Sequence, residues 1–142
     1  MTYYLDANIV SYLLKGNKEI FSKLSDLASN DHTICIPNIV YYEIKRGLLA
    51  NGASTKLNRF INFAKVLGIV EIKTSTLDIA AQIYADLKND GNIIEDDDIF
   101  IGATALENDA ILVTNNERHL GRIKDLKYEV WSWFIFFGRN II

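Results

Sequence analysis

The sequence predicts an α/β fold of three layers, in which helices cover both faces of a short, mainly parallel sheet. Segments with the helical spacing of apolar residues alternate with short strand-like runs along the whole chain. The strand-like runs are apolar throughout, which is typical of parallel strands buried on both faces. Polar residues follow several of these runs, at the edge where ligands bind in such sheets.

The first half of the chain begins with a predicted strand at residues 3–6. A helix at residues 8–14 is expected next, with Asn8 as its cap and Gly16 just beyond its end. Pro37, the single proline, is expected to stop the second strand. After the first helix we expect a helix at residues 18–28, a strand at 33–36, helices at 39–49 and 54–67, and a strand at 69–72.

The second half predicts two more helices and two more strands. A helix at residues 76–88 opens in a region of Ser and Thr caps, and another helix covers residues 98–107. Strands are expected at residues 111–114 and 127–131. We divide the chain into a folded domain at residues 1–131 and an apolar tail at residues 132–142, which either completes the core or packs against a partner.

Composition limits the functional class. The 142 residues make one domain of ordinary size, and 49% are apolar, enough for a core. The net charge of −3 argues against a general nucleic-acid binder but leaves a nuclease open. No apolar stretch has the roughly 20 residues needed to span a bilayer, and no signal peptide is evident. Cys35 is the only cysteine, so no intrachain disulfide forms, and we expect a cytoplasmic protein.

Four positions at strand ends or helix turns are candidate catalytic residues: Asp6, Glu43, Asp98 and Asn116. If Asp6, Glu43 and Asp98 converge, each carboxylate pair at about 4–5 Å costs roughly 3–4 kcal/mol. The sum, roughly 10 kcal/mol, is comparable to the stability of a whole domain. Such a cluster must take up protons or bind a cation. Oxygen ligands without a nearby His or Cys favour Mg²⁺, with Mn²⁺ as a substitute.

Each candidate also has a simpler interpretation. Glu43 alone is typical of a solvated helix residue. One Asp among residues 96–98 is explained by helix capping and the helix dipole, although three in a row are not. His32 and His119 are interpreted as surface or structural residues. No Ser or Cys has a His in a recognisable arrangement, so nucleophilic catalysis is not supported.

Four segments in order resemble the motifs of PIN-domain ribonucleases, and their order, spacing and chain length resemble VapC-type toxins of bacterial toxin–antitoxin pairs. The segments are YLDANI at residues 4–9, YEIKRG at 42–47, DIFIGATA at 98–105 and LVTNNERHL at 112–120. The resemblance extends over about residues 1–131. It implies a PIN-like fold and a metal-dependent endoribonuclease that hydrolyses phosphodiester bonds in tRNA or rRNA with a metal-activated water.

The resemblance also implies roles for individual residues. Asp6 and Asp98 are the expected principal metal ligands, and Glu43 completes the acidic pocket directly or through water. Asn116 stands where many relatives have a fourth acid. The expected supporting or substrate-binding residues are Asn8, Thr114, Asp96, Asp97, Arg46 and Arg118. A homodimer and a cognate antitoxin are the expected assemblies, with no membrane partner.

Two departures from the family pattern keep an alternative open. Ala7 replaces the hydroxyl residue that is usual after the first Asp, and Asn116 is neutral. Both reduce the polar ligands of the site, so a non-catalytic RNA- or protein-binding module with the same fold remains the second hypothesis. A phosphotransfer protein with an Asp nucleophile is disfavoured, because the segment after Asp6 lacks the second Asp and the Thr that such phosphatases carry.

Overall fold

The computed structural model describes residues 1–131, which form a five-stranded sheet with helices on both sides. All paired strands are parallel. The order is β3-β2-β1-β4-β5, so it reverses between β1 and β4, where ligands bind in sheets of this kind. The strands are β1 (Thr2–Leu5), β2 (Thr33–Pro37), β3 (Ile69–Val70), β4 (Ile111–Thr114) and β5 (Tyr128–Val130).

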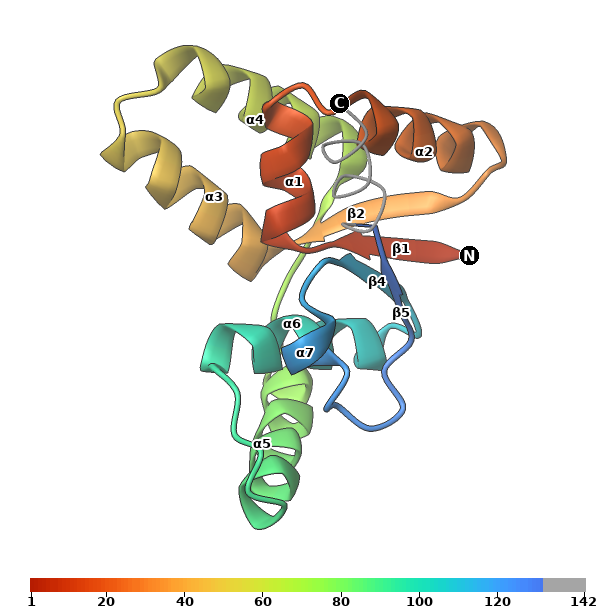
Figure 1. Cartoon of the computed structure of the whole chain (residues 1–142), viewed down its shortest axis with the longest axis vertical. Coiled ribbons are helices and arrows are strands. Elements are labelled where there is room, and N and C mark those ends of the chain that lie inside the picture. The colour runs from red at the N-terminus through yellow and green to blue at the C-terminus, as the bar shows by residue number, and fades with distance from the viewer. Residues whose placement is uncertain (132–142) are drawn as a thin grey trace, which may run out of the picture.

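Helices lie on both sides of the sheet, which confirms the predicted three-layer α/β architecture. Figure 1 shows α1, α2, α3 and α4 on one side and α5, α6 and α7 on the other. The helices are α1 (Ala7–Leu14), α2 (Lys18–Ser29), α3 (Asn38–Ala50), α4 (Ser54–Leu67), α5 (Thr74–Asn89), α6 (Asp96–Glu107) and α7 (Glu117–Leu120).

Several local expectations were wrong, and three of them bear on the site or the sheet. The cap of α1 is Asp6, whose carboxylate Oδ1 accepts a hydrogen bond from the Ala7 N–H at 2.7 Å, so Asn8 lies inside the helix. Helix α6 begins at Asp96 rather than Asp98, and its first turn holds three acids where the helix dipole favours negative charge. The third strand ends at Val70, two residues earlier than expected.

The sheet carries the core. In the central strand β1, Tyr3, Tyr4 and Leu5 are all buried, as expected for a parallel strand covered on both faces. Trp131 is buried as well, and Lys23 Nζ of α2 lies 4.9 Å from the centroid of its ring. Trp131 therefore belongs to the core, whereas the apolar tail predicted at residues 132–142 lies outside the described residues.

Cys35 behaves as a structural thiol. It is half-buried in β2, and its Sγ lies 3.6 Å from the carbonyl oxygen of Leu67. Burial raises the pKa of the Cys35 thiol, which disfavours the reactive thiolate. Over residues 1–131, no helix combines the length and the apolar character needed to cross a bilayer.

Candidate active site

Two adjacent strand ends bring the first candidate residues together. The register of β1 on β4 pairs Leu5 with Val113, so the next residues, Asp6 and Thr114, lie at the same edge of the sheet. The Asp6 N–H donates to the carbonyl oxygen of Val113 at 2.9 Å. The Thr114 hydroxyl donates to Asp6 Oδ2 at 2.6 Å. The site thus occupies the carboxyl edge of the sheet where the strand order reverses.

Asp6 is buried, with 4% of its surface exposed, and three donors bind it. Besides Ala7 and Thr114, the Asn8 amide Nδ2 donates to Asp6 Oδ2 at 3.2 Å. Burial nevertheless raises the pKa of Asp6, and repulsion from Asp97 adds to the increase, although all three hydrogen bonds act in the opposite direction. The ionised carboxylate is therefore held at an energetic cost that a nearby cation would reduce.

Glu43 of α3 lies in the same electrostatic field. The pKa of Glu43 is raised to about 7, mainly by burial. Repulsion from Asp97, a hydrogen bond with Asp97 and repulsion from Asp6 add to the increase, while Arg46 lowers the pKa. Among the described residues, its buried Oε1 has no hydrogen-bond partner. A buried oxygen without a partner costs free energy. Glu43 is therefore a member of the acidic cluster and not the solvated helix residue of the simpler interpretation.

Asp98 of α6 is held from the segment that follows β4. His119 Nδ1 lies 3.1 Å from Asp98 Oδ2, and the Asn116 amide Nδ2 donates to the same oxygen at 3.4 Å. Burial raises the pKa of Asp98, and repulsion from Asp97 and Asp6 adds to this, whereas the hydrogen bond with His119 lowers it. The mutual repulsion shows that Asp6, Glu43, Asp97 and Asp98 share one electrostatic cluster.

A hydrogen-bond network fixes the loop beside these acids. The Asn116 N–H donates to Thr114 Oγ1 at 2.9 Å, and the Asn115 N–H donates to Asn8 Oδ1 at 3.1 Å. The Asn115 side-chain amide donates to the Tyr12 hydroxyl at 2.6 Å. The first helix and the loop after β4 are thereby joined directly above the sheet edge.

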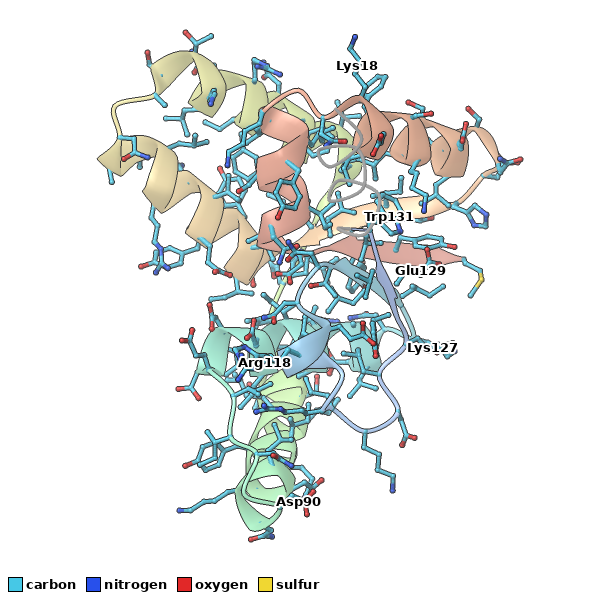
Figure 2. All side chains as sticks on the ribbon, viewed as in Figure 1. Lys18, Asp90, Arg118, Lys127, Glu129 and Trp131 are labelled. Carbon is cyan, nitrogen blue, oxygen red and sulfur yellow. The ribbon has the colours of Figure 1, made fainter. Side chains whose placement is uncertain are left out.

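The other predicted residues lie at the border of the cluster. Asp96 is exposed in the first turn of α6. Arg46 is exposed on α3, with its guanidinium 5.1 Å from the centroid of the Tyr42 ring. Arg118 is exposed on α7, beside α6 (Figure 2). None of the three has a hydrogen bond to Asp6, Glu43 or Asp98 among the contacts of the described residues.

The contact of His119 with Asp98 adds to the site a histidine that the sequence analysis interpreted as a surface or structural residue. Its side chain is 35% exposed, but it touches a central acid of the site. The sequence held one signal that could have found it. His119 follows Asn116 by three residues, which places both side chains on the same face of a helical turn.

The carboxylates suit a hydrated divalent cation. Within residues 1–131, no three Asp, Glu, His or Cys side chains are placed as a ready ligand set for one ion. Mg²⁺ does not require one, because it keeps several waters and takes only one or two carboxylates directly. The raised pKa values of Asp6, Glu43 and Asp98 and the unpartnered Glu43 Oε1 indicate negative charge that a cation would neutralise.

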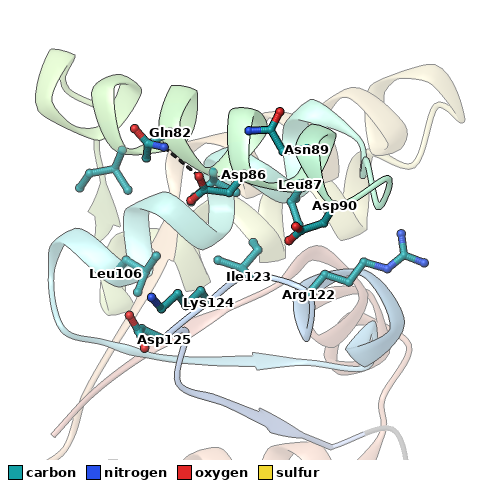
Figure 3. A pocket seen from close by; sticks show the side chains of 12 residues that line it. Gln82, Asp86, Leu87, Asn89, Asp90, Leu106, Arg122, Ile123, Lys124 and Asp125 are labelled. Atoms are coloured by element: carbon teal, nitrogen blue, oxygen red, sulfur yellow. Dashed lines mark hydrogen bonds between the residues drawn. The ribbon is translucent and has the colours of Figure 1, made fainter.

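Two cavities differ in their relation to the acids. Glu43 forms part of the wall of a cavity of about 230 Å³ between α1, α3 and α4, whose lining also includes Lys15 and Lys56. A larger cavity of about 590 Å³ lies between α5, the end of α6 and the residues after α7 (Figure 3). Its lining includes both charges, for example Asp86 and Arg122, but none of the candidate site residues. The smaller cavity is therefore the one relevant to the acidic cluster.

Comparison with known proteins agrees with the geometry. A profile of the PIN domain matches residues 3–126. Ribonuclease VapC2 of Haemophilus influenzae is 30% identical over 133 residues, which is 92% of this chain and 98% of the relative. Ribonuclease VapC2 of Rickettsia felis is 27% identical over 133 residues, which is 93% of this chain and 99% of the relative.

A solved structure is similar as well. The crystal structure of VapBC2 from Rickettsia felis bound to a DNA fragment from their promoter contains a chain that superposes with a TM-score of 0.83. The two chains are 29% identical, and the match covers 92% of this chain and 99% of that chain. The similarity therefore extends over nearly the whole described fold.

Proposed function

Because the chain belongs to the PIN-domain family and to its VapC ribonucleases, we propose that it is a Mg²⁺-dependent endoribonuclease toxin of a toxin–antitoxin pair. One observation carries the metal-dependent mechanism. Asp6, Asp98 and Glu43 come from three separate segments, and each has a raised pKa to which acids of the same cluster contribute. Clustered carboxylates with raised pKa values reduce the stability of the folded chain, and such groups are found most often at functional sites.

We assign Asp6 and Asp98 as direct ligands of Mg²⁺, or of Mn²⁺ as a substitute, and Glu43 as a ligand directly or through water. When bound, the ion supplies Lewis acidity at the scissile phosphate and lowers the pKa of water. Thr114 and Asn8 orient Asp6 through their hydrogen bonds, and Asn116 orients Asp98.

Glu43 is the residue suited to proton transfer. In the metal-free chain, its pKa of about 7 allows the carboxyl to take up or release a proton at neutral pH. The hydrogen bond between Glu43 and Asp97 raises this pKa, so the proton of the neutral carboxyl is shared with Asp97. Asp97, which raises the pKa of Glu43, is assigned an outer position in the cluster.

The RNA backbone is expected to lie beside the cluster. Lys15 and Lys56 line the 230 Å³ cavity that Glu43 borders, and both are exposed. With Arg46 and Arg118 they offer cations for phosphates on the approach to the acids. Loops of tRNA or rRNA are the proposed substrate, because their unpaired bases are accessible to a protein surface.

The proposed assemblies are a homodimer and a complex with a cognate antitoxin. The similar chain from Rickettsia felis was solved as part of VapBC2, which supports a complex of this kind. Phe21 of α2, 63% exposed, lines an apolar cavity of about 470 Å³ that offers a surface for a protein partner. The cytoplasm is the proposed location, because both RNA and antitoxin are encountered there, and residues 1–131 are the proposed nuclease domain.

A non-catalytic binding module is the second candidate. The neutral Asn116 favours it, because this residue donates to Asp98 instead of adding a charge. Thermal unfolding distinguishes the two functions. A cation present at about 100 times its dissociation constant adds roughly 2.7 kcal/mol to the free energy of unfolding. A module without a metal site gains nothing from millimolar Mg²⁺.

The direct test is cleavage of total tRNA and rRNA by the purified chain with Mg²⁺, in comparison with Asp6→Asn and Asp98→Asn. We expect both variants to lose at least about 100-fold in cleavage rate, in the range of a removed electrostatic group. Asp90→Asn is the matched control, since Asp90 is exposed at the far tip of α5 (Figure 2). Full cleavage by either site variant would contradict the proposed mechanism.

A further inference from the structure

His119 makes a contact that the proposed function does not use. It lies on α7, and its Nδ1 is 3.1 Å from Asp98 Oδ2 and 3.3 Å from Asn116 Nδ2. Asn116 Nδ2 lies 3.4 Å from the same Asp98 oxygen. The side chain of Asp98 is only 13% exposed, so these two partners are a large part of its polar surroundings.

The hydrogen-bond chemistry fixes the role of each nitrogen. An ionised carboxylate only accepts hydrogen bonds, so His119 Nδ1 must carry the hydrogen in its contact with Asp98. The Asn116 amide nitrogen is also a donor, and two donors do not bond to each other. Both therefore point to Asp98 Oδ2. No contact within residues 1–131 places a hydrogen-bond partner on Asp98 Oδ1, which remains available to a cation.

The backbone of α7 holds His119 in place. The Leu120 N–H donates to the carbonyl oxygen of Asn116 at 3.0 Å, and the Gly121 N–H donates to that of Glu117 at 2.8 Å. Leu120 is fully buried and anchors the turn in the core. The imidazole therefore projects from a fixed turn and does not depend on a mobile surface loop for its position.

We propose that His119 is a positioning residue whose Nδ1–H holds Asp98 Oδ2, so that Asp98 presents Oδ1 to the divalent cation. This inference rests on the proposed metal-dependent function. Hydrogen bonds to ligating carboxylates typically change metal affinity or activity by 10–100-fold when they are removed. His119 acts through Asp98 and needs no contact with RNA.

Two substitutions separate the two ring nitrogens. In His119→Asn, the amide nitrogen stands two bonds beyond Cβ, as His Nδ1 does, and can donate to Asp98. In His119→Gln, the amide nitrogen stands three bonds beyond Cβ, as His Nε2 does. If Asn at this position restores Mn²⁺ binding, His119 positions Asp98 through Nδ1. If Gln restores it instead, His119 has a different role through Nε2.

The experiment measures Mn²⁺ binding to the full chain without RNA, from the electron paramagnetic resonance signal of free Mn²⁺. We expect the dissociation constant to rise about 10–100-fold in His119→Ala and His119→Gln and to return to within about 3-fold in His119→Asn. Unchanged binding by His119→Ala, or restoration by Gln and not by Asn, would overturn the inference. Circular dichroism confirms that each variant is folded.

Mn²⁺ binding by Asp98→Asn and Asp6→Asn shows whether a negative result concerns only His119 or the proposed metal-dependent function itself. If these two lose Mn²⁺ while His119→Ala binds as the natural chain does, only the role of His119 is wrong. If all variants bind Mn²⁺ as the natural chain does, or if the natural chain binds no Mn²⁺, both the proposed metal site and the role of His119 are wrong.

Discussion

Replacing Glu43 by Gln should stabilise the metal-free protein at alkaline pH. The pKa of Glu43 is raised from 4.5 to about 7, chiefly by burial and by Asp97. A carboxyl with a raised pKa binds its proton more tightly in the folded chain. Its contribution to stability is thus present below about pH 4.5 and is lost as the pH rises through about 7. Gln has the uncharged form at every pH, so Glu43→Gln avoids this loss.

The magnitude follows from the size of the pKa change. Moving a pKa from 4.5 to about 7 corresponds to about 3 kcal/mol in full. Because the Glu43 side chain is only partly buried, solvent screening reduces this to roughly 1–2 kcal/mol. For a chain of this length, that equals a rise of about 3–8 °C in Tm. No hydrogen bond to Oε1 is lost, since this atom has no partner among the described residues.

Thermal unfolding in EDTA at pH 5 and pH 8 measures the effect. We expect the Tm advantage of Glu43→Gln over the natural chain to be about 3–8 °C larger at pH 8 than at pH 5. Millimolar Mg²⁺ should narrow this advantage at pH 8, because the ion compensates the charge. Glu71→Gln, at an exposed position, is the control and should show no such difference. An equal advantage at both pH values would refute the electrostatic reasoning.

Two further predictions concern the neighbours of the acids. Thr114→Val keeps the shape of the side chain but removes the donor to Asp6 Oδ2. We expect the free energy of unfolding, measured with urea, to fall by about 1–3 kcal/mol and Mn²⁺ binding to weaken. Lys15→Ala with Lys56→Ala should weaken RNA binding about equally for all sequences and reduce its salt dependence, as measured by fluorescence anisotropy, while Mn²⁺ affinity stays the same. A stable Thr114→Val protein, or an unchanged salt dependence, would contradict these expectations.

The sequence predicted the sheet well, for a clear physical reason. Runs such as residues 3–5 and 111–113 are short and apolar throughout, which is typical of strands buried on both faces. The observed contact of Asp6 with Thr114 follows from the same topology, because parallel strands end at the same edge of a sheet. Both features follow from regularities of strands and sheets that extend over several residues and can therefore be recognised in the sequence.

Contacts between distant side chains could not be predicted in the same way. The effect of Asp97 on the pKa of Glu43 arises from the packing of α6 near α3, which local spacing does not encode. The four-residue helix α7 is too short to show a periodic pattern, so the contact of His119 with Asp98 was missed. The cap of α1 was misplaced because Asp6 serves both the helix and the acidic cluster.

Anomalous diffraction from a crystal soaked in Mn²⁺ is the most direct test of metal binding between Asp6 and Asp98. We expect a peak about 2 Å from carboxylate oxygens of both Asp6 and Asp98, with Glu43 bound to the ion directly or through one water. A fully occupied Mn²⁺ elsewhere on the molecule, with none between Asp6 and Asp98, would contradict this expectation.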